Sequence, residues 1–293
     1  MSRLAERPRL HRLAEQVGTL SGLDRPAETV AKRIRATIPK GPVKDALSGT
    51  PLGHAIHPLL TDVPIGTWTS ATLLDLVGGR AARPASQRLI GLGILAAVPT
   101  SVTGANDWAD TTPASDSVRR IGAVHAVANV AALGLYAASL AARRRGDHAR
   151  GVALGLVGLG ALGVGGHLGG HLSYSKAVGV DQTAFEAGPE DWTEVLEESA
   201  LADGRLHAAE VDGRTVVLVR DGGRVHALAD RCAHRGGALH EGELVDGCVE
   251  CPLHGSRYRL TDGSVERGPS AYPQPVYEVR VQGGRVAVRA TGG

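Results

Sequence analysis

The sequence predicts two different folds in one chain, a bundle of four transmembrane α-helices followed by an all-β domain. Three long segments between residues 89 and 172 contain no Lys, Arg or Glu, and each is about the length that crosses a bilayer. After residue 181 the pattern changes to short alternating segments separated by Gly turns. All three cysteines, Cys232, Cys248 and Cys251, lie in this last part, where an odd number favours a metal site over a disulfide framework.

The composition and charge of the 293-residue chain indicate which kinds of binding partner the protein could have. A net charge of +2, without basic runs interleaved with aromatic residues, gives no indication of a nucleic-acid partner. The Arg-rich residues 1–53 predict a partly helical tail on membrane lipid, with a disordered tail as the alternative. This tail lacks the uninterrupted apolar core of a secretory signal, so nothing in it requires export.

The membrane domain is predicted over residues 54–175. Abundant glycine, 40 residues in the whole chain, suits the close packing of helices in lipid, and a soluble Ala/Gly-rich bundle is the alternative. The first predicted helix is the weakest, because it carries Asp62 and Asp75. The four predicted spans are 58–79, 89–108, 121–142 and 151–172.

Histidines cluster at one predicted membrane boundary, because helices joined by short turns alternate in direction. His54 and His57 precede or begin the first helix, His125 lies one turn inside the third, and His167 and His171 share one face near the end of the fourth. Three uses stay open: ligation of haem b or another metal, packing at the interface, or a proton or quinone-head site. The four that could share a haem or metal site are His57, His125, His167 and His171, and a di-metal site made by them in a substrate-transforming membrane enzyme is a further alternative.

Four motifs in this region carry a resemblance. The stretches "HAIHPLLTDVPIGTW", "GANDW", "HAVANV" and "GGHLGGHLSY" resemble a bacterial family of predicted four-helix membrane proteins of unknown function, over roughly residues 45–180. The resemblance implies the topology and the histidine set, and it implies no activity.

The β domain contains two mixed pairs of metal-binding residues, Cys232-x-His234 and Cys251-x-x-His254, with sixteen residues between them. A structural zinc site usually draws its ligands as Cys-Cys and His-His pairs. Mixed pairs favour a [2Fe–2S] cluster in which two thiolates hold one iron and two imidazoles hold the other. Structural zinc is the alternative.

The pattern C-x-H-x16-C-x-x-H, with "CPLHG" as its second loop, resembles the Rieske iron–sulfur family over about residues 190–291. The resemblance implies that Cys232 and Cys251 bind one iron. It also implies that His234 and His254 bind the iron that takes up the electron, near the surface where a partner docks.

Further positions in this domain bear on the reduction potential that the resemblance implies. Ser256 and Tyr258 match residues that hydrogen-bond cluster sulfur in high-potential members, whereas Gly237 and Leu253 stand where the quinol-oxidising members carry a disulfide. We therefore expect an intermediate potential. Cys248 matches no ligand position and is expected to be a small buried residue.

These expectations combine into a membrane-anchored electron-transfer protein of the cell membrane, with its Rieske domain on the cytoplasmic side. It would exchange electrons with a bundle cofactor, a quinone or a redox partner protein at the histidine-rich boundary; the alternative is a tethered ferredoxin or redox sensor whose bundle is only an anchor. Only 39 residues follow His254, without histidine, so a complete Rieske oxygenase is not expected. The expected domains are 1–53, 54–175, a linker at 176–190, and 191–293.

Overall fold

The computed structural model describes residues 8–112 and 115–291 of the chain. It divides into two compact units. The helical unit comprises the described residues up to Ile38 together with Ile56–Val178, and the second unit comprises Pro39–Ala55 and the described residues from Gly179 onward. The predicted class, a helical bundle followed by an all-β domain, is confirmed, and the helical part contains more helices than the four predicted.

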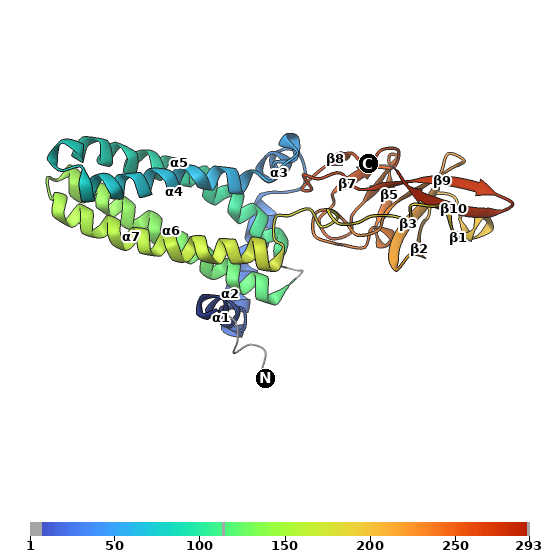
Figure 1. Cartoon of the computed structure of the whole chain (residues 1–293), viewed down its shortest axis with the longest axis horizontal. Helices are drawn as coiled ribbons and strands as arrows, with labels where there is room; N and C mark the ends of the chain where they lie inside the picture. The colour runs from blue at the N-terminus through green and yellow to red at the C-terminus, as the bar shows by residue number, and fades with distance from the viewer. Residues whose placement is uncertain (1–7, 113–114, 292–293) are drawn as a thin grey trace. The chain divides into compact units, whose positions relative to one another are not determined.

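The bundle is built from two helix pairs, α4 with α5 and α6 with α7, which also pack against each other (Figure 1). Its helices agree with the predicted spans, and each runs a little beyond the predicted ends on at least one side. The helices of the described chain are α1 (Arg9–Val17), α2 (Asp24–Thr37), α3 (Pro42–Ser48), α4 (Ile56–Val77), α5 (Arg83–Thr111), α6 (Asp116–Arg144) and α7 (His148–Gly170).

Three helical segments of the described chain are long and apolar enough to cross a membrane. They are Arg80–Thr111, Asp116–Arg144 and His148–Ser175. The helix α4 is not among them, which agrees with the two carboxylates that weakened its apolar pattern in the sequence. The bundle thus combines three strongly apolar helices with one of mixed character.

The centre of the bundle is organised by two stacked aromatic rings. Trp68 of α4 and Tyr136 of α6 lie with ring centroids 4.3 Å apart and planes inclined by 14°. Gly93 of α5 lies against the Trp68 ring and Gly158 of α7 against the Tyr136 ring, so that small residues let the helices approach. All four helices therefore meet at this pair.

Polar groups from three helices meet in a buried cluster at one end of the bundle. The Arg143 guanidinium donates to both carboxylate oxygens of Asp75 at 2.9 and 2.5 Å, and the two side chains are only 2% and 5% exposed. The Ser86 hydroxyl donates to the same carboxylate at 2.7 Å. The carboxylate that weakened the first predicted span is thus neutralised inside the bundle by an arginine that lies just beyond the predicted end of the third span.

Residues 9–37 are folded against the bundle, which differs from the predicted surface tail. Helix α1 packs on α6, and α2 packs on α5 and α6. The Asp24 carboxylate accepts hydrogen bonds from Arg119 and Arg120 at 2.8 and 2.7 Å, and these guanidinium groups hold the pKa of Asp24 well below its ordinary value. The basic residues at this end of α6 therefore form ion pairs within the protein, so fewer of them are available to bind lipid headgroups. The first seven residues of the predicted tail lie outside the described part.

The second unit contains two antiparallel sheets. The larger has the strand order β1-β10-β9-β4-β3-β2, and the smaller has the order β5-β6-β7-β8. The Gly turns expected from the sequence are confirmed: Gly222 and Gly223 join β3 to β4, Gly283 and Gly284 join β9 to β10, and each pair is an antiparallel hairpin. The strands are β1 (Thr193–Glu197), β2 (Leu206–Val211), β3 (Arg214–Asp221), β4 (Arg224–Ala229), β5 (Glu243–Val245), β6 (Cys248–Glu250), β7 (Arg257–Arg259), β8 (Val265–Arg267), β9 (Val276–Gln282) and β10 (Arg285–Ala290).

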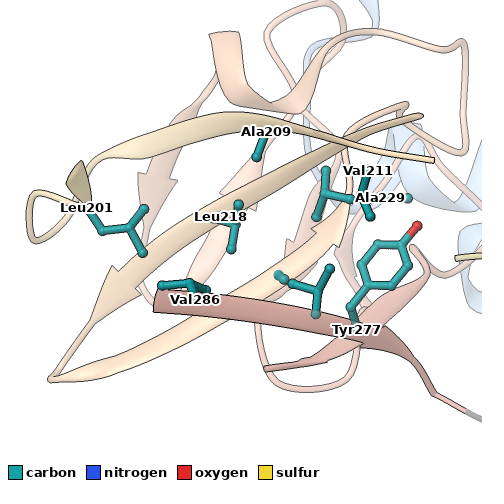
Figure 2. Packing of buried hydrophobic residues seen from close by; sticks show 10 residues of the cluster. Leu201, Ala209, Val211, Leu218, Ala229, Tyr277 and Val286 are labelled. Carbon is teal, nitrogen blue, oxygen red and sulfur yellow. The ribbon is translucent and has the colours of Figure 1, made fainter. Parts of the chain in front are cut away.

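Strand β3 is buried on both faces and joins two hydrophobic clusters. Leu218 lies in the first cluster with Tyr277 and Val286 (Figure 2), and Val216 belongs to the same cluster. The alternate residues Val217 and Val219 face the second cluster, where both Cys232 and Cys251 are buried. The two candidate cysteine ligands are therefore anchored in a hydrophobic core that they share with β3 of the larger sheet.

Replacing Arg143 by Met should destabilise the bundle, because it leaves the Asp75 carboxylate buried without its cation. We expect a loss of about 3–5 kcal/mol in the free energy of unfolding. Thermal unfolding of the detergent-solubilised protein measures it, and the double variant Asp75→Asn/Arg143→Met should recover most of the loss. Unfolding of Arg143→Met at the wild-type temperature would show that the ion pair contributes nothing.

Candidate metal centre

Two loops with the same backbone closure carry the mixed Cys/His pairs. In the first, the Cys232 N–H donates to the Gly237 carbonyl at 2.9 Å and the Gly236 N–H donates to the Cys232 carbonyl at 2.8 Å. In the second loop the Cys251 N–H donates to the Ser256 carbonyl at 2.8 Å, and the Gly255 N–H to the Cys251 carbonyl at 3.0 Å. Gly236 and Gly255 both have positive φ, of 68° and 80°, which a side chain would strain.

These loops bring the two predicted cysteine ligands together. Cys232 and Cys251 are 1% and 2% exposed, and their sulfurs are within hydrogen-bond distance of each other. This contact lowers the pKa of the Cys232 thiol to about 7, and backbone N–H groups of His234 and Arg235 lower it further. The same contact, together with burial, raises the pKa of the Cys251 thiol. A thiolate forms readily at this pair, and the thiolate is the form that binds metal.

The same loops bring the two predicted histidine ligands together. The imidazole rings of His234 and His254 lie with centroids 5.1 Å apart and planes inclined by 87°. Burial lowers the pKa of His234 well below its ordinary value, so the ring is neutral as metal binding requires. Its Nδ1 is buried and makes no hydrogen bond within the described residues. A buried nitrogen without a hydrogen-bond partner in the protein is suited to bind a group from outside the protein, such as a metal ion.

The ligands are grouped two and two. Among residues 8–112 and 115–291, no group of three or more His, Cys, Asp or Glu side chains is placed to hold one metal ion. A mononuclear zinc site needs four ligands around one ion. A [2Fe–2S] centre with two thiolates on one iron and two imidazoles on the other instead needs two separate pairs, and the observed arrangement fits it.

The residues predicted to surround the cluster lie beside the cysteines. The Tyr258 hydroxyl is 3.1 Å from the Cys232 sulfur, and the Ser256 hydroxyl accepts a hydrogen bond from the Ser270 N–H at 3.0 Å. Both side chains are fully buried. Gly237 and Leu253 are in contact, so the positions expected to lack a disulfide are neighbours packed without one.

Cys248 is 4% exposed, as expected for a small buried residue. It lies in β6 of the smaller sheet, opposite Val245 of β5 and Arg259 of β7. Burial raises the pKa of its thiol, which keeps the sulfur protonated. The pKa of the Cys248 thiol is therefore shifted in the opposite direction from that of Cys232.

Sequence reasoning missed a glutamine that braces the first loop. The Gln274 side chain is 2% exposed, accepts from the Ala233 N–H at 2.9 Å, and donates to the carbonyls of Ala229 and Arg231 at 2.7 Å each. The only signal in the sequence was the turn-rich stretch "GPSAYPQP", in which a glutamine stands between prolines.

Much of the predicted linker at 176–190 is packed on the β domain. The Gln182 N–H donates to the Ala233 carbonyl of the first ligand loop at 2.9 Å, and the Ala290 N–H donates to the Pro189 carbonyl at 2.8 Å. The Tyr272 hydroxyl donates to the Gly179 carbonyl at 3.2 Å. The free connection between the two units is therefore shorter than predicted.

The four membrane histidines predicted to share a site are divided into two groups. His57 hydrogen-bonds the Thr100 carbonyl at 3.0 Å, and His125 hydrogen-bonds the Gly165 carbonyl at 2.8 Å. These two rings lie within electrostatic range of each other.

His167 and His171 instead face α1. His167 bonds the Leu10 carbonyl at 3.3 Å, and His171 bonds Glu15 at 3.1 Å and packs on the ring of His11. Sequence spacing placed all four histidines at one boundary, but it did not indicate that α1 would bond two of them, His167 and His171. His54 lies in the second unit, with its ring on the adjacent Ala55 carbonyl.

Comparison with known proteins supports this division of the chain. Residues 191–278 match the family model of the Rieske [2Fe-2S] domain, and residues 53–182 match that of a predicted membrane protein (DUF2231). The anthranilate 1,2-dioxygenase ferredoxin subunit of Burkholderia cepacia is 39% identical over 82 residues, which are 28% of this chain and 76% of that protein.

Two further similarities cover the same region. The apoptosis-inducing factor 3 of Homo sapiens is 33% identical over 105 residues, which are 35% of this chain but only 17% of that much longer protein. The solved ferredoxin of carbazole 1,9a-dioxygenase from Nocardioides aromaticivorans is 31% identical, with a TM-score of 0.33, and the match covers 34% of this chain and 98% of that one.

The fold and the two ligand loops define an iron–sulfur electron-transfer domain attached to a helical domain. The chain belongs to the Rieske [2Fe-2S] family, and it joins the domain of that family to a predicted membrane domain of the DUF2231 type.

Replacing Gln274 by Ala should destabilise the second unit, because three backbone groups around the first ligand loop lose their partner. We expect a loss of about 3 kcal/mol, since each buried group left unsatisfied costs about 1–3 kcal/mol. Chemical unfolding monitored by circular dichroism measures the change. Gln282→Ala, at an exposed position at the end of β9, is the control and should have little effect. Equal stability of the two variants would contradict the bracing role.

Proposed function

We propose that this chain is a membrane-anchored electron-transfer protein whose Rieske domain holds a [2Fe–2S] cluster. Cys232 and Cys251 would bind one iron, and His234 and His254 would bind the other. One observation carries the proposal: two loops with identical closure present the thiols as one buried pair and the imidazoles as a second pair. That relatives are named as ferredoxin subunits of dioxygenases supports an electron-transfer role for this domain.

The chemistry supplied by such a cluster is the uptake and release of one electron at a time. The protein would adjust that chemistry through the groups around the ligands. Backbone N–H groups of Leu253 and His254 face the Cys251 sulfur, and those of His234 and Arg235 face the Cys232 sulfur. With the Tyr258 hydroxyl they stabilise negative charge on sulfur, which favours the reduced state and raises the potential.

The role of the bundle decides between the two forms of this proposal. In the first, the His57 and His125 pair receives or delivers electrons through haem b, another metal or a quinone. A backbone carbonyl bonds Nδ1 of each ring, which fixes the tautomer and leaves Nε2 as the ligating nitrogen. The Asn129 amide contacts the His125 Nε2 at 3.2 Å and would have to turn away.

In the second form, the bundle is only an anchor and the Rieske domain is a tethered ferredoxin or redox sensor. The close packing of residues at the two histidines favours this form: a β-carbon on Gly104 would lie 2.5 Å from the His57 ring, and one on Gly169 would lie 3.0 Å from the His125 ring. We therefore place the redox partner at the Rieske domain, as a protein or a quinone, with that domain on the cytoplasmic side.

Replacing Cys232 by Ser should abolish iron binding, because it removes a thiolate from the buried pair. Cys248→Ser is the matched control, since Cys248 is equally buried but lies outside the pair. Iron and acid-labile sulfide analysis with a visible spectrum distinguishes the variants, and only Cys248→Ser should retain both. Loss of iron in both variants, or in neither, would contradict the ligand assignment.

Haem extraction from protein expressed with ample haem distinguishes the two forms of the proposal. The anchor form predicts the broad absorbance of an iron–sulfur protein and no stoichiometric haem. Sharp bands on reduction, with one haem per chain that is lost in His125→Ala and retained in His167→Ala, would instead establish an electron path into the bundle.

A further inference from the structure

A short segment that precedes the bundle in the sequence belongs structurally to the Rieske unit. Residues Pro39–Ala55, here called the strap, contain α3 and a 3-10 turn at Thr50–Leu52. The strap lies between α2 and α4 in the chain, and both of those helices belong to the other unit. This segment of 17 residues thus belongs to a different unit from the helices on either side of it, and it contacts residues more than 200 positions later in the chain.

The strap contacts the Rieske unit at the second ligand loop and at the loop that follows β8. The Lys40 ammonium lies 3.3 Å from a carboxylate oxygen of Glu250, the residue before Cys251. The stem of the same lysine lies directly on Gly255, where an added β-carbon would be 2.4–2.8 Å from its atoms. Gly255 follows the predicted ligand His254, so Lys40 covers the backbone of the histidine-bearing turn.

The other end of the strap is fixed to the loop at residues 268–270. The Thr50 hydroxyl donates to the Ser270 carbonyl at 2.9 Å, and Gly268 lies directly against the Asp45 carboxylate, where an added β-carbon would be 2.8 Å from Oδ1. Ser270 in turn donates its N–H to Ser256 of the second ligand loop. The strap therefore reaches the ligand loop by a direct contact at Lys40 and through this neighbouring loop.

Between these two attachments, Lys44 of α3 lies near the edge of the Rieske domain that carries His234 and His254, here called the histidine edge. Lys44 is only 5% exposed, which is unusual for a lysine, and its charge is close enough to His234 to act on that ring. His254 is 7% exposed. A partner that exchanges electrons through these imidazoles must approach them closely, and in this structure the strap occupies part of that surface.

We propose that the strap is an intramolecular docking segment that covers the histidine edge of the Rieske domain and restricts access of a soluble electron-transfer protein to it. The inference rests on the proposed function, because it assigns the covered surface to electron exchange. Its consequence is that a soluble partner meets the two imidazoles only after the strap has moved away.

Chemical modification of histidine measures this covering directly. Full-length protein in detergent is treated with diethyl pyrocarbonate, and mass spectrometry follows the rate at which His254 and His234 are modified. In Lys40→Glu/Thr50→Val the strap loses the ion pair and the hydrogen bond that attach its two ends. Glu250 keeps Arg257 and Arg267 as partners, both at 2.8 Å, so the β domain retains its own ion pairs.

We expect the loss of these contacts to increase the rate of His254 modification about tenfold relative to the wild type. Lys32→Glu is the control, because it reverses the charge of an exposed lysine in α2, outside the strap. Its rate should equal that of the wild type. Modification of His254 at the same rate in all three proteins would overturn the proposal.

Iron and sulfide content of the same samples separates this inference from the proposed function. Wild-type protein without iron would refute the proposed function, whereas loaded wild-type protein with freely modified His254 would refute the covering alone. If the double variant fails to retain iron, the same comparison is made with Thr50→Val, which keeps Lys40 in place, and the same two outcomes apply.

Discussion

Two loops separated in the sequence have to present two thiols side by side and two imidazoles side by side, and the rest of the β domain depends on this requirement. Each loop is closed by the same pair of backbone hydrogen bonds around its cysteine. Both cysteines are buried in the cluster that contains Val217 and Val219 of β3. The sulfurs are thus held by a packed core rather than by a flexible surface loop, which limits the reorganisation needed when charge changes.

The helical unit meets a related requirement, because polar groups inside apolar helices need partners. Asp75 has Arg143 and Ser86, and His57 and His125 have backbone carbonyls of adjacent helices. His171 has Glu15 of α1. These polar residues of the bundle are therefore bonded within the protein. This pattern fits an anchor with a polar framework and favours the tethered form of the proposed function.

The length of the apolar segments, the turn residues and the spacing of the Cys and His ligands account for most of the features that the sequence predicted correctly. The four bundle helices, the two hairpins and the pairing of Cys232 with Cys251 follow from local patterns that are read directly from the sequence. What could not be predicted depends on contacts between distant segments. No local pattern indicates that Arg143 bonds Asp75, that Gln274 braces the first ligand loop, or that residues 39–55 pack on the β domain. Such pairings are selected by burial and charge in the folded chain.

The ligation of one iron by two imidazoles is the central claim, and nitrogen hyperfine coupling tests it most directly. Protein grown with 15N-labelled histidine would be reduced and its paramagnetic signal recorded by electron–nuclear double resonance. The account predicts two strongly coupled nitrogens that change with the label, since His234 and His254 would bind the same iron. A signal without nitrogen coupling, or a chain that contains zinc and gives no signal, would contradict it.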